Sequence, residues 1–351
     1  LRICHSSKVL SSLDGNEMEI VSLFSGAGGL DLGFENGGFH IVYANEFDKK
    51  IWSTFEKNFP GGSGFLDRRS LTEVKPKDIP DCQGIIGGPP CQSWSEAGAL
   101  RGIDDERGQL FFDFIRILRA KKPLFFLAEN VQGMLAPRNA SALKGIISLF
   151  EDAGYNVSYK LLNVSDYGIP QDRKRVVFVG YRKKLRKEFI FPEPTTLNKE
   201  TKKTLKDCIY DLKDSAMSAK PKNYSNFAKC KLPNHEYMIG GFSTIYMSRN
   251  RVRQWDEQSF TIQAGGRHAP IHPQAPVMLT VGRDQKIFKP GKEKLYRRLS
   301  VRECARIQTF PDTFIFDYEN LTDGYKMVGN AVPVKFAEVI AKQIMEDLSN
   351  A

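Results

Sequence analysis

The stretch Glu19-Ile20-Val21-Ser22-Leu23-Phe24-Ser25-Gly26-Ala27-Gly28-Gly29-Leu30-Asp31 decides the fold of this chain. Its first six residues form an apolar run that is typical of a buried strand, and a glycine-rich turn joins them to an amphipathic stretch. Strand, glycine turn and helix, in this order, open the nucleotide-binding units of α/β proteins. The stretch therefore predicts an α/β fold whose first turn approaches a ligand.

The same alternation of apolar runs and amphipathic stretches continues along the chain. We predict further strands over 40–45, 83–87, 123–127, 157–163 and 175–181, and helices over 48–58, 109–120, 140–153 and 334–348. This rhythm favours a doubly wound, mostly parallel, Rossmann-like sheet. The last helix carries Phe336, Val339, Ile340 and Ile344 on one face, so we expect it to return and cover the sheet.

The glycine turn narrows the choice of ligand. Asp31 stands where the dinucleotide fingerprint G-x-G-x-x-G requires its third glycine. Glu46, which follows the second predicted strand, is placed to hold ribose hydroxyls. These two features favour an adenosine that lacks a pyrophosphate, and hence S-adenosylmethionine over NAD. A tight turn with a purely structural role is the alternative.

Positive charge is concentrated in one part of the sequence. The chain has 351 residues and a net charge of +10, and between Arg182 and Arg253 it has 17 lysines and arginines against 7 acidic residues. From 182 to about 295 the regular alternation is lost, which predicts a smaller, separately packed domain. A basic segment of this kind favours a surface that binds a polyanion, although a solvated lysine-rich face is the alternative.

Several protein classes are excluded by composition. The sequence contains neither the run of roughly 18 apolar residues that a membrane span needs nor a secretory leader, so we expect no membrane partner and a cytoplasmic protein. The six cysteines lie far apart and the five histidines form no ligand cluster. We therefore expect neither a disulfide framework nor a metal site.

One cysteine is held in an unusual turn. It is Cys91, in Gly87-Gly88-Pro89-Pro90-Cys91-Gln92, directly after a predicted strand. The prolines fix the backbone and the glycines allow a ligand to approach closely. This arrangement indicates a thiol aimed at a ligand, with a buried structural cysteine as the alternative.

Six motifs in a fixed order now support a resemblance. They are Phe24-Ser25-Gly26-Ala27-Gly28-Gly29, Pro89-Pro90-Cys91-Gln92, Glu129-Asn130-Val131, Gln171-Asp172-Arg173-Lys174-Arg175, Arg302-Glu303-Cys304-Ala305-Arg306-Ile307-Gln308 and Gly329-Asn330-Ala331-Val332-Pro333. From about Met18 to its last residue the chain resembles DNA (cytosine-5-)-methyltransferases. Residues 245–255 and 272–276 are similar to the recognition domain of bacterial type II modification methylases specific for GGCC.

The resemblance implies methylation of carbon 5 in the 5′-most cytosine of GGCC. It implies that the Cys91 thiolate adds to carbon 6 and that Glu129 protonates ring nitrogen 3. Arg173 and Arg175 alternate along a predicted strand, so we expect both to face the same side and to bond the cytosine carbonyl. A structural carboxylate and solubilising edge-strand charges are the alternatives.

The resemblance also implies a set of residues that bind S-adenosylmethionine. Adenine would lie between Phe24 and Phe47, with Glu46 on the ribose. The remaining expected contacts are Gly26, Gly28, Leu30, Asn330 and Val332 at the methionine end and Pro89 beside the sulfonium. Arg69-Ser70-Leu71 stands where relatives carry Gly-Asp-Ile, which leaves Ser70, or alternatively Asp67, for the adenine amino group.

Double-stranded DNA is the expected partner. The target base must leave the helix, with Ile245 as an apolar wedge. We expect Arg249, Arg251 and Arg267 to read guanines, and Arg253 and the lysines between 199 and 231 to contact phosphates. The loop 264–270 departs from its counterparts in glycine and proline content, which could change the target.

Four segments make up the expected organisation. Residues 1–17 form an extension without function, 18–181 the catalytic and cofactor-binding domain, 182–296 the target recognition domain, and 297–351 the return to the catalytic domain. We expect a monomer that needs no contact with any cognate restriction endonuclease. The alternative functions are an RNA cytosine methyltransferase of the same fold and a DNA-binding protein with impaired catalysis.

Overall fold

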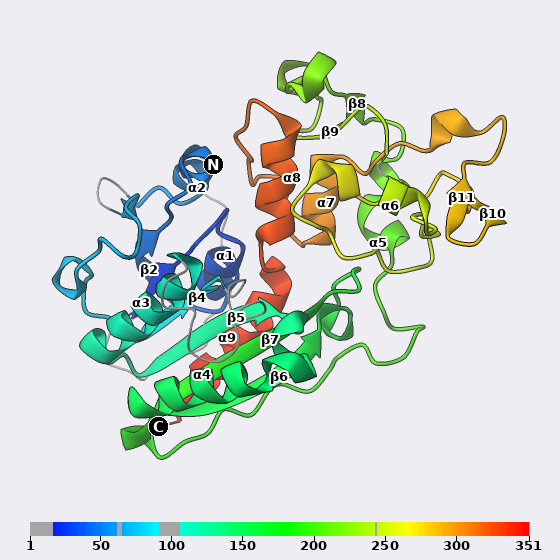
Figure 1. Ribbon diagram of the computed structural model, residues 1–351. Coiled ribbons are helices and arrows are strands. Elements are labelled where there is room, and N and C mark those ends of the chain that lie inside the picture. Colours follow the sequence, from blue (N-terminus) through cyan, green and yellow to red (C-terminus); the bar gives the residue numbers. More distant parts are fainter. Residues whose placement is uncertain (1–16, 62–64, 91–105, 243, 351) are drawn as a thin grey trace.

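The computed structural model describes residues 17–61, 65–90, 106–242 and 244–350, and it has two parts (Figure 1). One part is a large sheet with helices on both faces. The other is a smaller region of short elements, and helix α8 (Leu321–Asn330) stands between the two. Cys91 and the expected extension over 1–17, apart from its last residue, lie outside the described residues.

The large part is built on one seven-stranded sheet with the order β3-β2-β1-β4-β5-β7-β6. Its strands are β1 Met18–Leu23, β2 Phe39–Asn45, β3 Leu66–Asp67, β4 Gly84–Gly87, β5 Phe125–Val131, β6 Tyr155–Asn163 and β7 Lys174–Arg182. The strands from β3 to β5 run parallel, and β7 runs antiparallel to both β5 and β6. The predicted mostly parallel, doubly wound sheet is confirmed.

Helices cover both faces of this sheet. They are α1 Gly29–Asn36, α2 Lys49–Asn58, α3 Glu106–Lys121, α4 Ala140–Asp152 and α9 Val334–Ser349. The closing helix α9 buries Phe336, Ile340 and Ile344 as predicted, whereas Val339 is only partly buried. A Cβ atom at Gly33 of α1 would clash with Ala337, so the glycine lets α1 and α9 pack closely.

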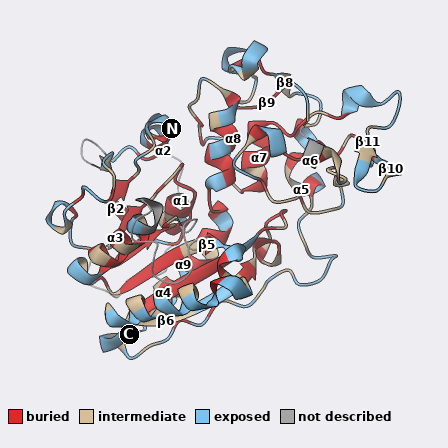
Figure 2. Cartoon of the chain, in the orientation of Figure 1, coloured by how far each residue is buried: buried red, intermediate tan, exposed pale blue. Residues whose placement is uncertain are grey.

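The smaller part contains little regular structure. Its elements are α5 Leu205–Ile209, β8 Met217–Ser218, β9 Glu236–Tyr237, α6 Thr244–Met247, β10 Leu279–Gly282, β11 Gln285–Ile287 and α7 Val301–Ile307. A small apolar core around Tyr246, Ile271 and Tyr296 lies within it. Buried residues also continue through α7 and α8 towards the sheet (Figure 2).

A shared core joins the two parts. Phe55 of α2, Ile307 of α7, Val328 of α8 and Ile262 of the smaller part belong to one buried apolar cluster. The relative position of the two parts is therefore fixed by packing as well as by the chain connections. None of the helices among the described residues is long and apolar enough to cross a membrane.

Candidate active site

A cavity of about 1100 Å³ opens at the carboxyl ends of β1, β2, β4 and β5. Residues from the turns after these strands line it, and the end of α8 closes one side. Its lining includes Phe24, Gly26, Glu46, Gly88, Pro89, Glu129, Asn130, Asn330 and Val332. In an open α/β sheet, ligands bind at the carboxyl ends of the strands where the strand order reverses, which here is between β1 and β4.

The glycine turn after β1 orients an acidic side chain into this cavity. Gly26 has φ +56°, a left-handed conformation that favours glycine, and its N–H donates to Glu46 Oε2 at 2.9 Å. The N–H of Asp48 donates to the other carboxylate oxygen at 2.7 Å. Burial raises the pKa of Glu46, and these two hydrogen bonds act in the opposite direction. Glu46 is thus held in one orientation, with its carboxylate at the cavity wall.

A second acidic side chain lines the same cavity. Glu129, on β5, pairs with Arg175, on β7, through an Oε1 to Nε distance of 2.6 Å. The side-chain amide of its neighbour Asn130 donates to the Pro89 carbonyl at 3.0 Å. Strand β5, which carries Glu129, is therefore hydrogen-bonded to the proline turn that precedes Cys91 in the sequence.

Arg173 does not share this site, which corrects the expectation that Arg173 and Arg175 face the same side. The strand begins at Lys174, so the alternation on which that expectation relied does not reach Arg173. The Arg173 side chain is 1% exposed and donates to the carbonyls of Ile262, Gly329 and Ala331 at 2.9 to 3.1 Å. Burial lowers its pKa to about 9, which leaves it protonated at neutral pH. Its terminal nitrogens are thus bound to backbone rather than presented to a ligand.

The expected cofactor residues divide into two groups. Seven of them line the cavity: Phe24, Gly26, Leu30, Glu46, Pro89, Asn330 and Val332. Gly28, Phe47 and Ser70 are not among its lining residues. A Cβ atom at Gly28 would clash with the Phe59 ring, and the Phe47 side chain is 69% exposed. Ser70 and its alternative Asp67 make hydrogen bonds with nearby protein groups, Ser70 with Thr72 and Asp67 with Tyr43 and Arg69.

Three charged residues at the cavity, Lys326, Asp48 and Arg138, were not anticipated from the sequence. Lys326 of α8 and Asp48 at the start of α2 both line it, and their Nζ and Oδ2 atoms are 2.8 Å apart. Lys326 lies one helical turn before Asn330, and this spacing could have indicated it. Asp48 lies two residues after Glu46 and also caps α2 through the Lys50 N–H.

A second cavity of about 640 Å³ adjoins Arg175. It lies where the ends of β5 and β6 and the start of β7 meet the smaller part of the chain. Its lining residues are Val131, Gln132, Gly133, Asn163, Asp172, Lys174, Arg175 and Thr261. This cavity could not be predicted from the sequence, because its lining residues come from four separate segments.

The arginines expected to meet DNA occupy different environments. Arg249 and Arg267 are exposed, and the Arg251 guanidinium lies 5.0 Å from the centre of the Tyr246 ring. Arg253 pairs with Asp172 at 3.2 Å and with Glu257 at 3.1 Å, so carboxylates already occupy both its terminal nitrogens. Ile245 lies in α6, and its side chain is outside the described residues.

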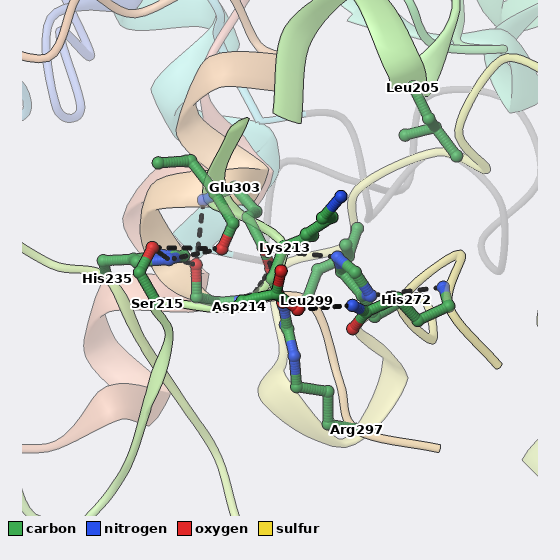
Figure 3. A network of polar contacts seen from close by, with 12 residues as sticks. Leu205, Lys213, Asp214, Ser215, His235, His272, Arg297, Leu299 and Glu303 are labelled. Atoms are coloured by element: carbon green, nitrogen blue, oxygen red, sulfur yellow. Dashed lines mark hydrogen bonds and ion pairs between the residues drawn. The ribbon is translucent and has the colours of Figure 1, made fainter. Parts of the chain in front are cut away.

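The 272–276 segment is anchored on a buried carboxylate at the start of α7 (Figure 3). Arg297 donates to both oxygens of Glu303 at 2.8 Å, and His272 Nε2 lies 3.5 Å from the same carboxylate. Although burial alone would raise the pKa of Glu303, Arg297 holds it at about 2. Burial lowers the pKa of His272 to about 4, so its ring is neutral and accepts the Gln274 N–H. This network fixes the backbone of the segment.

Comparison with known proteins decides the family. Residues 18–346 match the C-5 cytosine-specific DNA methylase family. The chain belongs to this family. The methylase is 58% identical over 334 residues to the type II methyltransferase M.FnuDI of Fusobacterium nucleatum, covering 95% of this chain and 96% of the relative. It is also 58% identical over 332 residues to M.MthTI of Methanothermobacter thermautotrophicus, covering 94% and 98%.

A solved structure supports the fold independently. The Dnmt2 methyltransferase of S. pombe superposes with a TM-score of 0.62 at 19% identity, covering 95% of this chain and 99% of that one. The methylase is thus a type II DNA cytosine-5 methyltransferase of the restriction-modification kind. Its family and fold imply S-adenosylmethionine as the methyl donor.

Proposed function

We propose that this methylase transfers a methyl group from S-adenosylmethionine to carbon 5 of the 5′-most cytosine of GGCC, on both strands of duplex DNA. The observation that carries the chemistry is that Glu46 and Glu129 line one cavity, and that Glu129 is paired with Arg175, which lines the adjoining second cavity. The Glu46 carboxylate is suited to bind a ribose, and the Glu129 carboxyl is suited to bind a polar ring. The proline turn that precedes Cys91 in the sequence lies beside Glu129.

The cofactor half of the cavity fits an adenosine that carries no phosphate. Its polar walls are the Glu46 carboxylate and the glycine turn. The described lining of the whole cavity holds two basic residues, Lys326, which is already paired with Asp48, and Arg138. Glu46 would accept hydrogen bonds from the ribose, while Gly26, Leu30, Asn330 and Val332 would surround the methionine end. When bound, the cofactor supplies an electrophilic methyl group.

The base half of the cavity provides groups for activating cytosine. Carbon 5 of cytosine is a weak nucleophile, and addition of the Cys91 thiolate at carbon 6 would give it electron density. Glu129 would hold the proton at ring nitrogen 3, and Arg175 orients that carboxyl through the 2.6 Å contact. Arg175 would also bond the cytosine carbonyl, whereas the terminal nitrogens of Arg173 donate to backbone carbonyls.

Access to the base requires flipping, because carbon 6 is shielded inside a stacked duplex. The basic smaller part would bind phosphates and offset the unstacking cost of a few kcal/mol. The exposed Arg249 and Arg267 are the candidates for guanine contacts. The GGCC target is supported by the resemblance of residues 245–255 and 272–276 to GGCC-specific methylases.

Plasmid protection tests the target directly. Plasmid DNA from cells that express the methylase is digested with an endonuclease that cuts GGCC, and bisulfite sequencing locates the modified base. We expect full protection and a mark on the 5′-most cytosine. Complete cleavage at GGCC, or transfer of labelled methyl to tRNA in preference to duplex DNA, would overturn the proposal. We further expect a monomer that needs neither a metal nor contact with a cognate endonuclease.

A further inference from the structure

Three segments that lie far apart in the sequence meet at the Arg173 side chain. Its Nη1 donates to the Ile262 carbonyl at 2.9 Å, and its Nη2 donates to the carbonyls of Gly329 and Ala331 at 3.0 and 3.1 Å. The first carbonyl belongs to segment 261–264 of the smaller part. The other two flank Asn330, at the end of α8.

Two buried glutamines join the same segments. Gln171 accepts the Ile262 N–H at 2.9 Å and donates to the Gln308 side-chain oxygen at 2.8 Å. Gln308 in turn donates to the carbonyls of Val328 and Ala331 at 2.9 and 3.1 Å. Both glutamine side chains are fully buried. The junction is therefore a continuous polar cluster shielded from water, where each hydrogen bond is costly to lose.

The backbones at this junction are in direct contact. A Cβ atom at Gly329 would clash with the Gln263 carbonyl group and with the Ala264 N–H. Only glycine allows the end of α8 to approach segment 261–264 this closely. A shift of segment 261–264 must therefore move the end of α8 as well.

Both sides of the junction line cavities. Asn330, Ala331 and Val332 form part of the large cavity, and Thr261 lines the second cavity beside Arg175. Residues 261–264 also lead directly to the exposed Arg267. The junction thus connects the wall expected to face the cofactor with the segment expected to face DNA.

We propose that Arg173 is a positioning residue that holds the cofactor wall Asn330–Val332 against segment 261–264, so that binding of cofactor and binding of duplex DNA depend on each other. The inference rests on the proposed function and adds a route by which the two ligands communicate. Binding of one ligand would favour the arrangement that the other needs, which is a coupling free energy between two sites.

Arg302 provides a matched control. Its side chain is fully buried and donates to the carbonyls of Pro233, Pro311 and Phe314 at 2.9, 3.0 and 2.7 Å. None of these three carbonyl residues lines either cavity. Loss of Arg302 therefore removes the same kind of buried interaction without touching the junction.

The test measures the affinity for S-adenosylhomocysteine by calorimetry, with and without a short unmethylated GGCC duplex, on the full chain. For the wild type we expect the duplex to tighten binding about fivefold or more, within the usual range of coupling between sites. Arg173→Ala should reduce this ratio to less than about twofold. Arg302→Ala should keep the wild-type ratio even if it lowers the melting temperature as much.

Two further variants decide the matter if Arg173→Ala does not fold. Arg173→Lys keeps the positive charge but loses the planar set of guanidinium N–H donors. It should give a ratio of affinities, with and without duplex, between those of the wild type and Arg173→Ala. Gly329→Ala keeps Arg173 but forces the backbones apart, and it should reduce the ratio as Arg173→Ala does. A wild-type ratio in the Arg173 or Gly329 variants, an equal loss in Arg302→Ala, or no coupling in the wild type would overturn the inference. Absence of any methyl transfer by the wild type would instead overturn the proposed function.

Discussion

Glu129 Oε1 and Arg175 Nε lie 2.6 Å apart on the neighbouring antiparallel strands β5 and β7, and their side chains are only 13% and 14% exposed. Glu129 lines the large cavity together with the proline turn, whereas Arg175 lines the adjoining second cavity. An ion pair withdrawn from water is oriented more firmly than a surface pair, because fewer water molecules compete for its hydrogen bonds. The contact therefore holds the Glu129 carboxylate and the Arg175 guanidinium in a defined relative orientation.

We expect Glu129→Gln to lower kcat by about 10²-fold or more, since a positioned acid or base typically contributes 10² to 10⁴. Glutamine is nearly isosteric and can still bond Arg175, so duplex affinity should change little. Single-turnover methyl transfer and gel shifts on the same preparation measure both quantities. Wild-type turnover in this variant would show that Glu129 takes no part in the chemistry. Glu257→Gln serves as the control, because Glu257 is another carboxylate that is paired with an arginine.

Cys91→Ser should abolish methyl transfer and leave duplex binding intact. A serine hydroxyl is a far weaker nucleophile than a thiolate at neutral pH, while the residues that we expect to contact phosphates lie elsewhere on the chain. Tritiated methyl incorporation measures the loss, and Cys208→Ser is a control, because Cys208 hydrogen-bonds a backbone carbonyl remote from the cavity. Residual activity above a few per cent of wild type would contradict the covalent assignment.

Arg249→Ala should weaken discrimination among DNA sites more than it weakens binding overall. A lost bidentate contact to guanine costs about 1–3 kcal/mol and relaxes recognition at one position. Loss of an exposed lysine in the basic segment, as in Lys199→Ala, should weaken binding equally for all sequences and reduce its salt dependence. Rates of methylation on GGCC and on singly altered duplexes separate the two outcomes. Unchanged discrimination in Arg249→Ala would assign that arginine to phosphate instead.

The sequence predicted the elements whose signals are local. Strand β1, its glycine turn and helix α1 were found because a buried strand and a glycine bend each leave a short-range pattern. Strand β3, with only two residues, leaves no such pattern and was missed. The smaller part could not be predicted in detail, because its short elements are held by buried polar side chains rather than by a periodic apolar face.

The candidate site was predictable to the extent that motifs place residues at strand ends. Glu46 and Glu129 reached the cavity because each follows or ends a strand at the same edge of the sheet. The contacts of the Arg173 side chain were not predicted, because its partners, Ile262 and the end of α8, are 89 to 158 residues away along the chain. A contact at that separation has no signature in the local sequence. The tertiary structure alone reveals it.

The buried carboxyl of Asp31, in the first turn of α1, gives a prediction about stability and pH. Burial raises its pKa to about 7 from an ordinary value of 3.8, and Ser22 acts in the opposite direction. Between these two values the unfolded chain has released a proton that the folded chain retains, so stability falls as pH rises from about 4 to 7. Above pH 7 the folded protein holds a buried charge, at a cost on the order of 4 kcal/mol.

Asp31→Asn removes this charge, so we expect it to stabilise the methylase at pH 8 and to have little effect near pH 4. The difference in unfolding free energy between variant and wild type, measured by denaturant titration, should grow steadily across that interval. Glu346→Gln, which changes an exposed carboxylate on α9, is the control and should show no such growth. Because Asp31 does not line the cavity, cofactor affinity should be unchanged. A difference that is independent of pH would show that the Asp31 carboxyl ionises as freely in the folded protein as in the unfolded chain.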